Sequence, residues 1–190
     1  MAKEPPDRTI SASLARVRAA WRFRGQERPE FAVEPGPGQA SVWDYPRPPA
    51  IVPEPRQVQV HASDRILASS NRAVRVCETG SPPTVYVPRD DVDTARLELS
   101  ATRSFCEWKG AASYLRLKDA GAHSSDVAWC YPQPFTGFEH YAGWLCFYPG
   151  RIACFLDSER VRPQPGDFYG GWITAELVGP FKGEPGTAHW

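Results

Sequence analysis

Residues 143–157 read GWLCFYPGRIACFLD, and this stretch decides the fold class. Two apolar runs flank Pro149 and Gly150, a pair that is typical of a turn, so the stretch predicts a β-hairpin. Because the apolar residues follow one another almost without interruption, we expect both faces of these strands to be buried. The stretch therefore indicates a protein whose core is built from strands.

Other short runs with the same character precede this hairpin. Residues 57–67, QVQVHASDRIL, alternate around Val58 and Val60 and turn at 62–64, which predicts a second hairpin. The runs 71–78 and 83–88 flank a turn at TGSPP, and the runs 111–117 and 127–132 add further strands. About eight short strands between 56 and 157 predict an all-β fold. A small twisted antiparallel barrel or sandwich is the expected architecture.

The segments on either side of this body differ in composition. Ile10, Leu14, Val17 and Trp21 are spaced as one stripe of an α-helix over 10–24, which we expect to dock on the domain; a membrane-surface or partner helix is the weaker alternative. The next segment is rich in proline, and we expect an extended arm that lies against the domain. The last segment is rich in glycine and aromatic residues and is expected to wrap the surface. The predicted divisions are a helical segment 1–33, a Pro-rich arm 34–55, a β domain 56–157 and a tail 158–190.

Composition excludes several classes of partner. The 22 basic and 22 acidic residues give a net charge of zero, so we expect no nucleic-acid partner. No apolar run is long enough to span a bilayer, and the N-terminus lacks the apolar core of a signal peptide. The five cysteines contain no CxxC pair and sit among apolar residues, which predicts reduced thiols, a cytoplasmic location and no metal or other cofactor.

Residues 102–114, TRSFCEWKGAASY, hold the candidate chemistry. Cys106 lacks a redox partner and precedes Glu107, which disfavours a thiolate, so we interpret it as structural. Lys109 is followed by small residues and could bind a carboxylate or phosphate in a pocket, or form a Schiff base; the alternative is a surface lysine beside a turn. Glu78 ends a strand, where it either caps a loop or faces Lys109 as a pocket acid.

Aromatic residues on several predicted strands form the second candidate feature. Alternation along a strand places Trp129 and Tyr131 on one face, and Tyr86, Tyr114 and Phe147 come from other strands. Such rings either form the core or make a cage for a planar or cationic group. The predicted ligand-binding residues are Glu78, Tyr86, Lys109, Tyr114, Trp129 and Tyr131.

Four ordered motifs resemble the DUF427 family of uncharacterised bacterial proteins, also labelled nucleotidyltransferase-like. They are VCETGSPPTVYVPRDDV, TRSFCEWKGAASY, AWCYPQP and GWLCFYPGRI, and the stretch 170–190 resembles the tail of actinobacterial members. The family usually has CPYKG where this chain has Cys106, Glu107 and Trp108 before the lysine. The resemblance implies a β-tent fold related to Mss4-like proteins, but no established activity. No nucleotide-binding motif supports the transferase label.

Three functional hypotheses follow. The first is a domain that binds a small molecule or a modified residue in an aromatic-walled pocket, with Lys109 and Glu78 orienting the ligand. The second is a hydrolase or transferase that uses Glu78 as the base and Lys109 as an electrostatic stabiliser. The third is a structural module in which the flanking segments make a homo-oligomer or partner interface. The three hypotheses leave open whether the protein is an enzyme.

Overall fold

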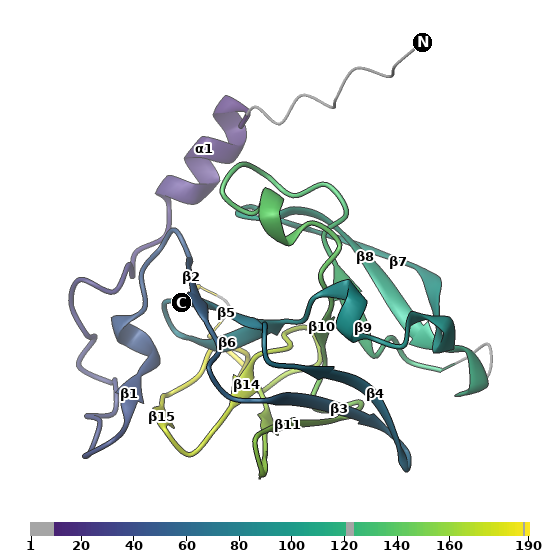
Figure 1. Ribbon diagram of the computed structural model, residues 1–190. Helices are drawn as coiled ribbons and strands as arrows, with labels where there is room; N and C mark the ends of the chain where they lie inside the picture. Colours follow the sequence, from purple (N-terminus) through teal and green to yellow (C-terminus); the bar gives the residue numbers. More distant parts are fainter. Residues whose placement is uncertain (1–9, 121–123, 188) are drawn as a thin grey trace.

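The fold consists mostly of short strands. The computed structural model describes residues 10–120, 124–187 and 189–190. In that part of the chain one α-helix and five short 3₁₀ turns accompany the strands. The predicted all-β class with an N-terminal helix is confirmed, and the strands are arranged in several small sheets without closing a barrel (Figure 1).

Two sheets have four strands each, in the orders β10-β9-β8-β7 and β12-β11-β3-β4. A third has the order β2-β5-β6, and the pairs β1-β15 and β13-β14 complete the set. All neighbouring strands are antiparallel except β1 and β15. The strands are β1 Ala40–Ser41, β2 Ala50–Pro53, β3 Val58–Ala62, β4 Arg65–Ser70, β5 Val74–Glu78, β6 Ser81–Tyr86, β7 Leu97–Cys106, β8 Gly110–Leu117, β9 Ala128–Cys130, β10 Cys146–Phe147, β11 Ala153–Leu156, β12 Glu159–Arg160, β13 Arg162–Pro163, β14 Trp172–Ile173 and β15 Leu177–Val178. The helix and turns are α1 Ala12–Ala19, η1 Val42–Asp44, η2 Arg89–Asp91, η3 Thr94–Arg96, η4 Lys118–Ala120 and η5 Glu139–Tyr141.

The predicted hairpin at 57–67 is confirmed. β3 and β4 pair antiparallel around a turn in which Ser63 has a positive φ of 54°. Val58, Val60 and Ala62 are buried, whereas the residues between them are half-buried, as strand alternation requires. The turn TGSPP is shorter than predicted, because Ser81, Pro82 and Pro83 belong to β6. β6 is an edge strand of its sheet, where proline is tolerated.

The hairpin predicted at 143–157 is wrong in its pairing. A turn does form, since the carbonyl of Tyr148 accepts hydrogen bonds from the amides of Arg151 and Ile152. The two strands then join different sheets: β10 pairs with β9, and β11 pairs with β3 and β12. The predicted burial does hold for β10, where both residues are buried. A strand buried on both faces has no partner specified by its sequence, so the pattern identified strands and not their neighbours.

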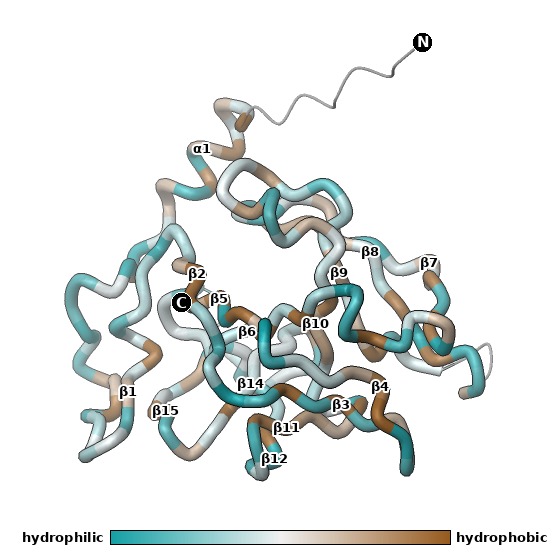
Figure 2. Tube along the Cα trace, viewed as in Figure 1, coloured by the Kyte–Doolittle hydropathy of each residue, from teal (hydrophilic) through white to brown (hydrophobic). Residues whose placement is uncertain are grey.

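The N-terminal helix is shorter and less buried than predicted. α1 ends at Ala19, so Trp21 lies beyond it, and none of its residues is buried. The apolar stripe docks only in part: Val17 is 52% exposed, whereas Leu14 and Trp21 are half-buried. Apolar and polar residues are mixed along the helix (Figure 2). The predicted cap is present, because Ser11 Oγ accepts a hydrogen bond from the Leu14 amide. No helix in the described ranges has the length and apolar character needed to cross a membrane.

The flanking segments contribute to the sheets. The Pro-rich segment supplies β2, which pairs with β5, and Trp43 packs in a small cluster with Val42 and Leu177. The tail does more than wrap the surface, because Trp172 is 1% exposed and lies in the main core. Its indole Nε1 donates a hydrogen bond to the carbonyl of Phe147.

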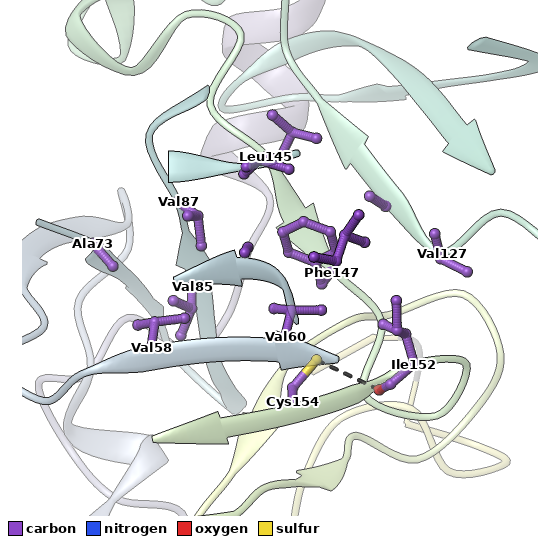
Figure 3. Packing of buried hydrophobic residues seen from close by; sticks show 14 of the residues in the cluster. Val58, Val60, Ala73, Val85, Val87, Val127, Leu145, Phe147, Ile152 and Cys154 are labelled. Carbon is purple, nitrogen blue, oxygen red and sulfur yellow. Dashed lines mark hydrogen bonds between the residues drawn. The ribbon is translucent and has the colours of Figure 1, made fainter. Parts of the chain in front are cut away.

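Strand alternation divides the interior into two clusters. The aliphatic core lies on one face and includes Val85, Leu115, Ala128 and Phe147 (Figure 3). The residues next to them along the same strands point to the opposite face and form the aromatic cluster. Its buried members are Val74, Val76, Tyr86, Ala112, Tyr114, Trp129, Tyr131, Phe138, Cys146 and Tyr148.

Candidate functional site

A cavity of about 220 Å³ lies against the aromatic cluster. Its lining comes from strands β5 to β9, the N-terminal segment and the tail. The structure brings all the sequence-predicted site residues to this one cavity. They are Glu78, Tyr86, Lys109, Tyr114, Trp129 and Tyr131.

Aromatic rings make up a large part of the cavity wall. Trp129 and Tyr148 pack with their ring centroids 4.5 Å apart, and the Tyr114 hydroxyl lies 2.7 Å from Ser104 Oγ. These contacts hold the rings in fixed positions, which favours flat ligands that stack on them. Nine aromatic residues line the cavity: Trp21, Tyr86, Phe105, Tyr114, Trp129, Tyr131, Tyr148, Phe168 and Tyr169.

Lys109 is a buried residue of the cavity lining. It is the last residue of the β7–β8 turn and is only 8% exposed, and its Nζ lies 5.9 Å and 6.0 Å from the ring centroids of Tyr131 and Phe138. Within the described ranges its ammonium makes no hydrogen bond or ion pair. Burial lowers the pKa of Lys109, but Cys106, Glu78, Cys146 and Glu107 together raise it by more, so the net shift is upward. The side chain is therefore a buried cation.

Glu78 pairs with a different cation from the one that the sequence suggested. The Arg47 Nε lies 3.0 Å from Glu78 Oε1, and no ion pair joins Glu78 to Lys109 among the described residues. Arg47 also donates to the carbonyls of Phe23 and Thr79, so each of its three nitrogens makes a hydrogen bond. Arg47 lies in the Pro-rich segment, 31 positions before Glu78 in the sequence, and no local pattern predicts their contact. Glu78 and Lys109 therefore line the same cavity but do not form the expected ion pair with each other.

The Tyr86 hydroxyl is a second buried polar group without a partner. Tyr86 is 2% exposed, and its hydroxyl makes no hydrogen bond of standard geometry. Its polar neighbour is the thiol of Cys146, a weak hydrogen-bonding group. Burial raises the pKa of Tyr86 well above its ordinary value, so the hydroxyl keeps its proton and remains a donor. A buried donor of this kind is uncommon in proteins unless something else binds it.

Sequence reasoning missed the cavity residues that come from the flanking segments. Trp21 lies with its ring 4.0 Å from Lys182 Nζ and 4.2 Å from the Arg47 guanidinium. Lys182 is 5% exposed and donates to the carbonyl of Trp190, and burial lowers its pKa to about 8. The helical stripe that included Trp21 predicted docking but not the place, and the tail has no periodic pattern. The further signal was the presence of tryptophan and tyrosine in otherwise polar stretches, since such rings are seldom left in water.

The N-terminal segment is attached at the turn between β7 and β8. Trp21 Nε1 donates to Glu107 Oε1 at 2.9 Å, and Arg18 Nε donates to the Glu107 carbonyl at 2.7 Å. The next residue before it, Cys106, is half-buried and lines the cavity. Glu107 therefore anchors the N-terminal segment to this turn. No three metal-ligating side chains gather anywhere in the described part of the chain.

Comparison with known proteins assigns the central part of the chain to a family. Residues 50–158 match the family model described as a domain of unknown function, DUF427. The match covers more than half of the chain, so the chain belongs to this family. No curated protein shows significant similarity to it.

Proposed function

We propose that this DUF427 protein binds a small, flat molecule in the cavity between its aromatic cluster and its flanking segments. The observation that carries the proposal is the lining: nine rings surround about 220 Å³ that also contains a buried ammonium and a buried hydroxyl without partners. Ligand sites typically combine apolar, aromatic walls with a few polar groups in this way. The volume is below the usual range for drug-sized ligands, which favours a ligand of about one or two rings.

The catalytic alternative has less support. A general base needs access to the proton that it removes, and Glu78 is engaged by Arg47. The thiol of Cys146 does not line the cavity and is fully buried, and burial raises its pKa well above the ordinary value, which leaves it protonated. Binding without a chemical step therefore accounts best for the groups in this cavity.

A ligand-observed NMR screen of flat one- and two-ring compounds tests the proposal. We expect some compounds to bind the wild-type chain. Trp129→Ala should lower their affinity by about tenfold or more, because stacking area is lost. Phe155→Ala is the matched control, since that ring packs on His61 and lies outside the cavity. Failure of every compound to bind, or equal effects of the two variants, would count against a ligand site here.

A further inference from the structure

The charges around the cavity indicate which kind of flat ligand fits. Two of its carboxylate-bearing residues already have partners: Glu78 pairs with Arg47, and Glu107 accepts from Trp21. The ammoniums of Lys109 and Lys182 face no carboxylate in an ion pair among the described residues. Lys109, Lys182 and the adjoining Arg47 set three positive charges against the two carboxylates of Glu78 and Glu107, so one positive charge has no counterpart among these residues.

A cationic ligand is disfavoured by the same arrangement. Aromatic cages attract cations, but here the rings already carry resident ones. Lys109 Nζ lies over Tyr131 and Phe138, and Lys182 Nζ lies over Trp21 and Tyr169. A further cation would meet two ammoniums at close range, and this repulsion would be strong in a site shielded from water.

Lys109 and Tyr86 lie against the same cluster and the same cavity. Lys109 Nζ lies over the rings of Tyr131 and Phe138, which belong to the buried cluster that also contains Tyr86. Lys109 is 8% exposed and Tyr86 is 2% exposed, and each lines the cavity. An ammonium and a hydroxyl that line one small cavity make a donor pair that suits an acceptor with two oxygens.

We propose that the ligand is an aromatic or heteroaromatic carboxylate, whose carboxylate pairs with the Lys109 ammonium and accepts a hydrogen bond from the Tyr86 hydroxyl. This inference rests on the proposed function and narrows its ligand class. A phosphate fits less well, because no guanidinium of the described residues lines the cavity: Arg47 is held by Glu78 and two backbone carbonyls, and the carboxylates of Glu78 and Glu107 oppose a second negative charge.

Matched pairs of probes test the inference. Benzoate is compared with benzamide, and nicotinate with nicotinamide, by calorimetric or NMR titration of the full chain. These pairs keep the ring and change only the charged group. We expect the wild-type chain to bind the carboxylate of each pair about tenfold more tightly or better, as a charge-assisted contact in a buried site implies.

Variants then assign the contact. Lys109→Met should abolish the preference, because it weakens the binding of the carboxylate probes and changes the affinity for the amide probes by no more than about twofold. Tyr86→Phe should weaken carboxylate binding to a smaller extent. Lys118→Met is the charge-matched control, because that exposed lysine bonds to the Ala95 carbonyl outside the cavity. The wild-type comparison needs no variant, so the test survives a Lys109 variant that fails to fold.

The outcomes separate the two proposals. If the amides bind as tightly as the carboxylates, the carboxylate inference is overturned while the flat-ligand site stands. If carboxylates are preferred but Lys109→Met leaves that preference intact, the assignment to Lys109 is overturned. If neither the probes nor the wider screen bind, the proposed function itself fails.

Discussion

The aliphatic core and the aromatic cluster share strands β6, β8, β9 and β10 but differ in their side chains and in how closely they are packed. Along β9, Ala128 and Cys130 face the core, whereas Trp129 faces the cluster; along β10, Phe147 and Cys146 divide in the same way. The core is closed by close contacts between aliphatic side chains, whereas the cluster borders a cavity with buried polar groups. One face of these strands therefore stabilises the fold, and the other leaves groups that a ligand can satisfy.

The largest expected effect comes from a substitution in the aliphatic core. Phe147 is 0% exposed, and Phe147→Ala should lower the free energy of unfolding by about 3–5 kcal/mol, because it leaves a void that the core cannot fill. Trp129→Ala removes a larger ring, but that ring already borders a cavity, so we expect about half that loss. Urea unfolding of both variants checks the difference. A loss for Trp129→Ala as large as for Phe147→Ala would mean that the cluster is as tightly packed as the core.

The next effect depends on pH and concerns Lys182, which lines the cavity beside the aromatic cluster. The pKa of Lys182 is lowered to about 8 in the folded chain, and an unfolded lysine titrates near 10.5. Between these values the unfolded state binds more protons, so the contribution of Lys182 to stability rises with pH across that window. The rise amounts to roughly 3 kcal/mol. The difference in unfolding free energy between wild type and Lys182→Met, measured from pH 7 to 10.5, should show it; a flat difference would contradict the buried position.

A smaller effect tests how closely the tail approaches the cavity wall. A Cβ on Gly170 would lie 2.4 Å from the Trp129 ring, so Gly170→Ala must displace the ring or the tail. We expect a loss of about 1–3 kcal/mol in unfolding free energy and a change in tryptophan fluorescence. Gly36→Ala is the control, since its nearest contact is a flexible side chain at 3.3 Å, and it should stay within about 0.5 kcal/mol. Equal effects would mean that the tail is not seated as described.

The smallest effect has the opposite sign. Tyr86→Phe removes a buried hydroxyl that has no partner, and should raise the free energy of unfolding by up to about 1 kcal/mol. Tyr114→Phe removes a hydroxyl that lies 2.7 Å from Ser104 Oγ, and should lower it by about the same amount. Thermal unfolding of the pair gives the comparison. A stabilised variant with weakened carboxylate binding would identify Tyr86 as a residue kept for function at the expense of stability.

The sequence predicted what depends on local pattern. Alternation identified the β3–β4 hairpin, and it placed Trp129 and Tyr131 on one face, where the structure has them in the aromatic cluster. It did not predict which strands pair, because β10 and β11 are apolar enough to join any sheet. It also could not predict that Arg47 reaches Glu78 or that Lys182 reaches Trp21, since these contacts join segments that are far apart in the chain.

The origin of the cavity lining has a consequence for how such a site can diversify. Residues 50–158 supply the strand-borne wall, whereas Trp21, Gln164, Tyr169 and Lys182 come from outside that range. The strands of the wall also carry the core, and the tail adds Trp172 to it. Trp21 and Tyr169 belong to none of the buried clusters. Under the proposed function, exchange of these two residues would alter which ligands bind while the scaffold keeps its stability.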